Sequence, residues 1–333
     1  MSTIRWGIVG TGSIANSMAR MIQLADASEI AAVSSRRMET ARAFADTHNV
    51  PTAFDSWEEM CGSDKVDAIY VATPTSVREE ICLAAATNGK HVLGEKPFAS
   101  LPSVRRITAA CRDNGVAFMD GTHFVHHPRT LDIKTNSQER LGWPWSVASA
   151  FQFNLPDRSN IRFNTELEPM GAIGDAGWYN MRAAVEYLAP GIELETVSAH
   201  LRRDEETGAA ISGSGVLHMS DGSTSTWNCG FDSGAVVMDL RITGSAGVIS
   251  IGDFLSQNSD GSADFVYRKG GWGRGAEETI SVPSAKPGAA LMFEDMAAAA
   301  ADAALREQWM IATERTQALL DAAWVAALQA EKA

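Results

Sequence analysis

Lys96 is the charged residue of this chain that is best placed to take part in chemistry. It stands in the stretch HVLGEKPFAS at 91–100, where a short apolar run predicts a strand that ends in Glu95 and Lys96. Parallel sheets bind their ligands beside the carboxyl ends of the strands, so this strand would deliver Lys96 into a ligand-binding cleft where its charge is used. The alternative is a surface lysine followed by a stiff turn at Pro97.

Asp175 and Tyr179 form a second pair of reactive side chains, in the stretch GAIGDAGWY at 171–179. They are four residues apart, so a helix over 175–188 would place both on one face at its start, where Asp175 also suits the helix cap. A free tyrosine has a pKa of about 10, and it needs a nearby positive charge such as Lys96 to act as a base near neutrality. The alternative is that Asp175 only caps the helix and Tyr179 only packs.

A glycine-rich turn at 10–15, with the sequence GTGSIA, follows the first predicted strand and opens the first predicted helix. This is the context of a dinucleotide fingerprint, in which Gly10 permits the tight turn and Gly12 lets the backbone approach the pyrophosphate. The alternative is a purely structural turn. We expect the turn to bind a nicotinamide cofactor through Gly10, Thr11, Gly12, Ser13 and Ile14.

The end of the second predicted strand indicates which nicotinamide cofactor binds, because it reads SSRR at 34–37. An acidic residue here would bind the ribose 2′-hydroxyl of NAD, whereas arginine accepts the 2′-phosphate of NADP. The stretch holds no carboxylate, and its two guanidinium groups offer charge-assisted hydrogen bonds. We expect Ser35, Arg36 and Arg37 to select NADP, with NAD as the alternative cofactor.

The elements that must position these residues follow from the hydrophobic pattern. Short apolar runs alternate with amphipathic stretches over the first 120 residues, which is typical of βαβ units and a parallel sheet. We expect a six-stranded, doubly wound Rossmann domain over 1–122. Beyond it, strands follow one another with few helices between them, which predicts an α+β domain over 123–333 with a large, open, mainly antiparallel sheet. The strands expected there lie at 146–155, 194–203, 210–219, 223–231, 236–244 and 247–252, and two helices close the chain at about 289–304 and 307–330.

Composition argues against several classes of function. The chain has 333 residues and a formal net charge of −13, which opposes binding to nucleic acid or to an anionic membrane surface. No apolar stretch approaches the roughly 20 residues of a membrane helix, and the N-terminus lacks a signal-peptide pattern, so we expect a cytoplasmic protein. The four cysteines are widely separated, and the histidines at 123, 126 and 127 lack the spacing of a metal motif. No metal site is expected.

Four motifs together resemble those of the superfamily of glucose-fructose oxidoreductase, inositol dehydrogenase and MocA (Gfo/Idh/MocA). They are GTGSIA at 10–15, VATPTS at 71–76, GKHVLGEKP at 89–97 and GAIGDAGWY at 171–179. The resemblance covers nearly the whole chain. Its serine and arginine stretch and its tyrosine are most similar to NADP-using dihydrodiol and xylose dehydrogenases.

The resemblance implies roles for individual residues. Lys96 matches the catalytic-site lysine near the nicotinamide and the substrate oxygen, and the Lys96–Pro97 bond matches one that is usually cis. Asp175 matches a substrate-binding aspartate, and Tyr179 matches the group that handles the proton. The matching cofactor contacts are Thr73, Pro74, Glu95 and Lys96.

On the substrate side, the resemblance is less complete. Asn160 and Arg162 match a stretch that precedes the catalytic helix, where they could reach substrate hydroxyls or only shape a loop. Arg78 replaces a common histidine and Val125 replaces a usual arginine, and both changes touch the substrate side. The resemblance therefore does not name the substrate.

The sequence as a whole predicts an NADP-dependent oxidoreductase. It would transfer a hydride between the nicotinamide and a carbinol or carbonyl carbon of a sugar-like or cyclic diol substrate. The alternatives are a glycoside hydrolase-like enzyme with a retained cofactor and a non-catalytic NAD(P)-binding sensor. We expect a homodimer through the open sheet of the second domain, with a tetramer as the alternative.

Overall fold

The computed structural model describes residues 3–271 and 275–333. The chain divides into two compact units, of which the first holds Met1–His126 and Lys286–Glu314 and the second holds His127–Ala285 and Arg315–Ala333. The boundary expected after residue 122 thus lies near the observed division after His126. The first unit differs from the expectation in also including a segment from late in the chain.

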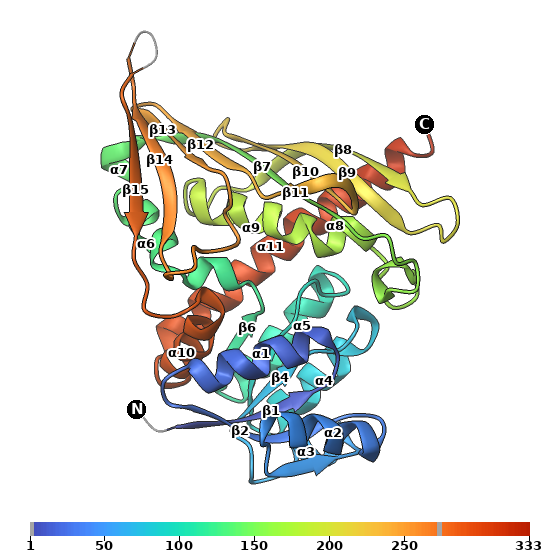
Figure 1. Ribbon diagram of the computed structural model, residues 1–333. Coiled ribbons are helices and arrows are strands. Elements are labelled where there is room, and N and C mark those ends of the chain that lie inside the picture. The colour runs from blue at the N-terminus through green and yellow to red at the C-terminus, as the bar shows by residue number, and fades with distance from the viewer. Residues whose placement is uncertain (1–2, 272–274) are drawn as a thin grey trace. The chain divides into compact units, whose positions relative to one another are not determined.

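A six-stranded parallel sheet forms the centre of the first unit, as the alternating pattern predicts (Figure 1). Its strand order is β3-β2-β1-β4-β5-β6, so the topology reverses between β1 and β4, as in a doubly wound fold. The edge strand β3 has three residues, which is too short for its pattern to be recognised. The elements of this unit are β1 (Ile4–Val9), α1 (Ser13–Leu24), β2 (Ser28–Ser34), α2 (Met38–His48), β3 (Thr52–Phe54), α3 (Trp57–Cys61), β4 (Ala68–Val71), α4 (Thr75–Thr87), β5 (His91–Gly94), α5 (Leu101–Asp113), β6 (Phe118–Asp120), the 3-10 turn η1 (His123–His126), α10 (Gly288–Ala301) and the beginning of α11 (Ala303–Ala330).

The late segment belongs to the first unit because α10 completes its apolar core. Trp6 of β1 and Tyr70 of β4 each meet the ring of Phe293 edge to face, with centroids 5.0 and 5.8 Å apart. Met292 and Met296 of the same helix are fully buried in this cluster. Burying each such side chain contributes about 1.5–3 kcal/mol, so the sheet depends on α10 for much of its core.

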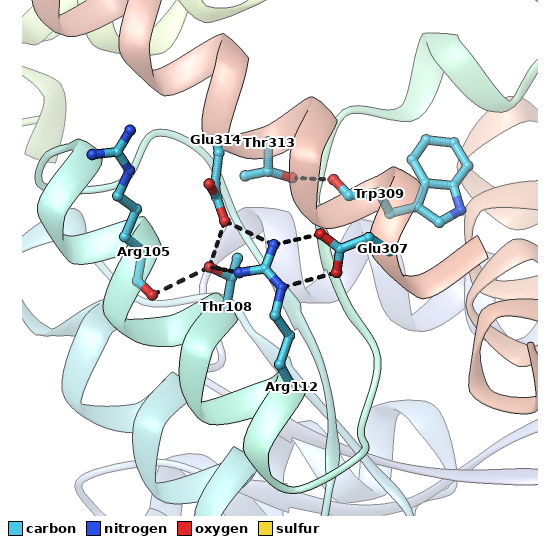
Figure 2. Close-up of polar contacts among 7 residues, drawn as sticks. All are labelled: Arg105, Thr108, Arg112, Glu307, Trp309, Thr313 and Glu314. Atoms are coloured by element: carbon cyan, nitrogen blue, oxygen red, sulfur yellow. Dashed lines mark hydrogen bonds and ion pairs between the residues drawn. The ribbon is translucent and has the colours of Figure 1, made fainter. Parts of the chain in front are cut away.

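Polar contacts fix the beginning of α11 against α5 (Figure 2). Arg112 donates from Nε to Glu307 at 2.8 Å and from a terminal nitrogen to Glu314 at 3.1 Å. Thr108 donates from its hydroxyl to the same oxygen of Glu314 at 2.7 Å. Partly exposed pairs of this kind add little stability, so the network mainly sets the register of α11 along α5.

The second unit is built on a nine-stranded, mainly antiparallel sheet in the order β15-β14-β13-β12-β7-β10-β9-β8, with β11 also paired to β7. Among the described strands of this sheet, β7 and β10 are the one parallel pair, with Ser149 opposite Trp227. Helices α8 and α9 lie along one face (Figure 1), where Asn180 donates to the hydroxyl of Ser149 at 2.8 Å. The elements are α6 (Pro128–Thr135), α7 (Ser137–Arg140), β7 (Pro144–Asn154), η2 (Ile161–Phe163), α8 (Gly171–Asp175), α9 (Gly177–Tyr187), β8 (Leu194–Arg203), β9 (Ala210–Met219), β10 (Thr224–Gly230), β11 (Asp232–Val237), β12 (Leu240–Gly244), β13 (Gly247–Ile251), β14 (Ala263–Lys269) and β15 (Glu277–Val282).

The cysteine residues pack as small apolar side chains. All four are buried and free, and burial raises the pKa of Cys61 and of Cys111 to about 12. Among the described residues, no group of three or more His, Cys, Asp or Glu side chains is arranged to hold a metal ion. Within that same part of the chain, no helix is long and apolar enough to span a membrane.

Candidate active site

The glycine-rich turn has the backbone geometry that a dinucleotide site requires. Gly10 has a φ of +105°, and a Cβ there would lie 2.7 Å from the carbonyl oxygen of Ala72, so only glycine fits. Gly12 precedes α1, and a Cβ at Gly12 would meet nothing within 4 Å. No side chain of the described residues caps α1, which leaves the first amide groups of this helix open to a phosphate. Asn16 donates to the carbonyls of Thr11 and Gly12 at 3.2 and 2.9 Å and so braces the turn.

The end of β2 lies beside this turn. Gly10 donates its amide to the carbonyl of Ser34 at 2.9 Å, and the hydroxyls of Thr11 and Ser35 are 3.5 Å apart. Arg36 and Arg37 are exposed, and neither guanidinium has an ion pair within the described part of the chain. Two cations are therefore available next to the turn, as NADP binding would require.

A buried carboxylate, that of Glu95, ends strand β5. The residue is 7% exposed, and the hydroxyl of Tyr70 donates to Glu95 Oε1 at 2.6 Å. A Cβ at Gly121 would lie 2.9 Å from the same oxygen, so the glycine leaves room for the carboxylate. Burial raises the pKa of Glu95, whereas the neighbouring charge of Lys96 and the hydrogen bond from Tyr70 oppose the rise. The carboxylate of Glu95 is thus buried at the carboxyl end of β5 and held in place by Tyr70.

Lys96 follows directly at the carboxyl end of β5, where the sequence predicts it. Its side chain is half-buried, and the Lys96–Pro97 bond is cis, as the family resemblance implies. Thr73 and Pro74 lie after the neighbouring strand β4, at the same edge of the sheet. The hydroxyl oxygen of Thr73 is buried and has no hydrogen-bond partner among the described residues. Buried polar atoms are nearly always bonded, so this hydroxyl fits a contact with a bound ligand.

The second unit holds Asp175 and Tyr179 at a break between two helices. The helix predicted over 175–188 is divided, because α8 ends at Asp175 and α9 begins at Gly177. Ala176 occupies the position before α9, and no side chain of the described residues caps that helix. The expectation that Asp175 caps the helix is therefore wrong, since Asp175 is itself the last residue of α8.

An ion pair in the second unit holds the carboxylate of Asp175. Arg162 donates from Nε to one oxygen at 2.7 Å and from a terminal nitrogen to the other at 3.1 Å. The side chain of Asp175 is 13% exposed and that of Arg162 is 36% exposed. Asn160 in turn accepts the amide hydrogen of Arg162 at 3.1 Å, so the loop of η2 is organised around this pair. Two of the guanidinium's five N–H donors are used on Asp175, and one terminal nitrogen lies 3.5 Å from the side-chain oxygen of Asn160.

Tyr179 lies close to the same guanidinium. Asp175 is the main cause that raises the pKa of Arg162, and Tyr179 contributes to the rise. Tyr179 is 7% exposed and packs edge to face against Phe151, with ring centroids 5.5 Å apart. From the sequence, Lys96 is the positive charge expected near this phenol. The structure provides one within the same unit, on Arg162.

Comparisons with known proteins match segments of both units of the chain. A model of the oxidoreductase family with an NAD-binding Rossmann fold matches residues 4–122, and a model of the GFO/IDH/MocA C-terminal domain matches residues 135–250. D-xylose 1-dehydrogenase (NADP(+)) 2 from Haloferax volcanii is 33% identical over 230 residues, which cover 68% of this chain and 70% of the relative. Trans-1,2-dihydrobenzene-1,2-diol dehydrogenase from Xenopus laevis is 32% identical over 199 residues, or 59% of each chain.

The fold also matches that of a solved structure. The crystal structure of a 3-ketoreductase from Actinomadura kijaniata in complex with NADP and TDP-benzene aligns with a TM-score of 0.87 over 98% of both chains. Its sequence is 24% identical, so this likeness concerns the fold alone. It includes both the parallel sheet of the first unit and the large sheet of the second.

Proposed function

Because this chain belongs to the Gfo/Idh/MocA family of oxidoreductases, we propose that it is an NADP-dependent dehydrogenase or reductase of sugar-like or cyclic diol substrates. The observation that supports it most directly lies in the first unit. There the open glycine turn, the unpaired Arg36 and Arg37, and Lys96 all occur at the carboxyl ends of strands in one parallel sheet. This is the edge at which doubly wound sheets bind ligands.

The residues present fit NADP as the resident cofactor. Gly10, Gly12 and the first amides of α1 would hold the pyrophosphate, and Arg36 with Arg37 would hold the 2′-phosphate. When bound, the cofactor supplies or accepts the hydride. Ser35, Thr73, Pro74 and Glu95 are further proposed contacts, and the unpartnered hydroxyl of Thr73 supports this assignment.

On the substrate side, we assign the proton chemistry to two groups. Lys96 would stabilise the substrate oxygen through its ammonium, and the hydroxyl of Tyr179 would give or take the proton. Asp175 would orient a substrate hydroxyl, and Arg162 holds that carboxylate in place through two hydrogen bonds. Asn160 supports this pair and could donate its amide hydrogens to the substrate.

Relatives narrow the substrate class but do not name the substrate. One acts on D-xylose with NADP and another on a dihydrobenzene diol, so both act on a ring carbon that carries a hydroxyl next to another hydroxyl. We propose a substrate of this class, a sugar or a cyclic vicinal diol, or the corresponding ketone.

A substrate panel tests the proposal. Aldoses, inosose-like ketones and cyclic diols are incubated with the protein and each cofactor, and the absorbance of reduced nicotinamide is followed. Turnover with NADP and at least one member is the expected result. Conversion of a glycoside without net absorbance change would replace the proposal with a hydrolase that retains its cofactor. Cofactor binding without turnover of any member would replace it with a sensor.

We also propose that two copies of the chain pair through the open face of the second unit's sheet. No helix of the described residues lies over this face in Figure 1. Its exposed side chains are mostly small or polar, among them Ser214, Thr226, Asn228 and Arg241. A sheet face without a covering helix can pair with the same face of a second copy through a twofold axis. Light scattering at micromolar protein should give the mass of a dimer or tetramer, and a uniform monomer would refute this assignment.

A further inference from the structure

Arg78 is a buried cation in the first unit that the proposed reaction leaves without a role. It lies in the first turn of α4, on the helix face that also buries Ile81, Cys82 and Ala85, and it is 3% exposed. Burying a guanidinium is costly, and Arg78 Nε has no hydrogen-bond partner in the described part of the chain. An apolar side chain would fill this position without that cost. Stability alone therefore does not account for the arginine.

The hydrogen bonds of Arg78 join two loops at the carboxyl edge of the parallel sheet. One terminal nitrogen donates to the carbonyl oxygen of Thr73, which follows β4. The other donates to the carbonyl oxygen of Pro97, which follows β5, and to the hydroxyl of Thr75 at 3.1 Å. Thr75 donates in turn to the same carbonyl of Pro97 at 3.3 Å. The guanidinium is a rigid planar fork, so it fixes both the spacing and the orientation of the two loops.

Each of these loops carries a residue of the proposed site. Pro97 follows Lys96 directly. The carbonyl that Arg78 holds is therefore one residue away from the backbone that carries the lysine side chain. Thr73 carries the buried hydroxyl without a partner. Misplacing a reacting group by about 1 Å can lower a rate by about 100-fold, so the orientation of this backbone matters for Lys96.

The guanidinium of Arg78 also interacts with Glu95 and Phe98, which flank Lys96 and Pro97 in the chain. Arg78 forms no ion pair within the described residues. Burial raises the pKa of Glu95, and the charge of Lys96, the hydrogen bond from Tyr70 and the charge of Arg78 oppose this rise. Its guanidinium carbon lies 6.0 Å from the centre of the ring of Phe98, in the same loop as Lys96. The contacts of this side chain are thus concentrated on the two site loops.

We propose that Arg78 is a positioning residue that clamps the loops at 73–75 and 95–98 together and so holds Lys96 in its working orientation. This inference rests on the proposed function, because it assigns Lys96 to the substrate oxygen. The sequence places Arg78 on the substrate side, whereas this inference assigns its terminal nitrogens to the backbone of its own unit, at the carbonyls of Thr73 and Pro97.

Three variants test the clamp. Arg78→Met removes all donors at similar length, and Arg78→Lys keeps the charge but loses the planar fork. Arg106→Met is the control, because Arg106 of α5 is an arginine of the same unit that contacts α4, through a partly exposed pair with Glu79 at 2.5 Å, and within the described residues it makes no hydrogen bond or ion pair with the two loops. We expect Arg78→Met to lower kcat by about 10–100-fold, with a smaller change in KM for the substrate. Arg78→Lys should recover only part of this loss, and Arg106→Met should retain wild-type kcat.

A double-mutant cycle shows whether the effect passes through Lys96. In a Lys96→Met background, adding Arg78→Met should lower the residual kcat by less than about threefold, because the group that the clamp orients is already absent. An equal loss in both backgrounds would overturn the inference, since Arg78 would then act independently of the lysine.

A second measurement does not depend on turnover. Lys96 is labelled with an amine-reactive reagent over a range of pH, and its modification is quantified by peptide mass spectrometry. The clamp predicts that the labelling rate and its pH midpoint change in Arg78→Met and Arg78→Lys but not in Arg106→Met. Unchanged labelling in folded Arg78 variants would refute the clamp. A shift in labelling in a protein that turns over no substrate would refute the proposed function and leave the clamp supported.

Discussion

The preference for NADP over NAD can be tested directly by substituting two exposed arginines. The change is the double substitution Arg36→Ala with Arg37→Ala, at the exposed end of β2. Neither arginine pairs with a carboxylate of the described residues, so the substitution breaks no internal ion pair and should leave the fold intact. Ser35 is kept, because its hydroxyl lies 2.7 Å from that of Thr40 and helps to order the start of α2.

The magnitude follows from the exposure of these side chains. A hydrogen bond to a charged group contributes about 1.5–3 kcal/mol, but exposed pairs are screened by solvent and fall at or below the lower end of this range. We therefore assign about 1–1.5 kcal/mol to each arginine, or about 2–3 kcal/mol to the two. Since each 1.4 kcal/mol is about tenfold in affinity, the double variant should bind NADP about 30–150-fold more weakly. NAD lacks the 2′-phosphate, so its affinity should change little.

The assay is a titration of both cofactors into wild type and variant, followed by intrinsic tryptophan fluorescence. Arg105→Ala serves as the control, because Arg105 is an exposed arginine on another helix of the same unit (Figure 2). Raising the ionic strength from about 0.1 to 1 M shortens the screening length from about 10 to about 3 Å, so the preference of wild type for NADP should shrink with salt. Equal losses of affinity for NADP and NAD would refute the reasoning, because the arginines would then hold the adenosine or the fold and not the phosphate.

Other predictions concern the second half of the site and the stability of the fold. Lys96→Met and Tyr179→Phe should each lower kcat by about 10²–10⁴-fold with the cofactor affinity unchanged, whereas wild-type turnover in Tyr179→Phe would make the tyrosine a packing residue. Arg162→Met should raise KM for the substrate and lower the free energy of unfolding in urea by about 1–2 kcal/mol, because it leaves Asp175 unpaired; an unchanged KM would limit the pair to a structural role. Burial lowers the pKa of His91 in the folded state, so the unfolded chain binds its proton more readily and stability should fall as the pH drops below about 6.5. His91→Asn should flatten this part of the melting-temperature profile, and a profile as steep as that of wild type would assign the effect to other groups.

The parallel sheet could be predicted because each of its longer strands is a continuous apolar run followed by a helical pattern. Strand β14 (Ala263–Lys269) escaped prediction although it carries apolar side chains, and two other strands escaped because their side chains lack such a pattern. β3 has three residues, and β15 is an exposed edge strand that begins with two glutamates, Glu277 and Glu278. The expected strand at 236–244 proved to contain the end of β11 and all of β12. Such a division depends on pairing with β7, which is a property of the tertiary structure.

The site could be predicted only as far as residue type and position along a strand allow. Lys96 and the glycine turn lie where the pattern of strands places them. The partners of Asp175 and Glu95 could not be inferred, because Arg162 and Tyr70 are brought to them by the fold and not by spacing in sequence. Arg78 did leave a signal, since it falls on the same face of α4 as Ile81, Cys82 and Ala85. A charged residue on a buried helix face indicates a partner inside the protein, whereas the family resemblance places Arg78 on the substrate side.

The dependence of the first unit on α10 has a consequence for the synthesis of the protein. The strands of the cofactor-binding sheet leave the ribosome first, but the side chains of Met292, Phe293 and Met296 that cover one of its faces are made only after the whole sheet of the second unit. Until then that apolar face lacks its cover and is open to chaperones or to aggregation. A premature stop after residue 285 would therefore damage the nucleotide-binding half of the enzyme, although the lesion lies at the opposite end of the gene. The two units are expected to reach their native state together, late in synthesis, and not one after the other.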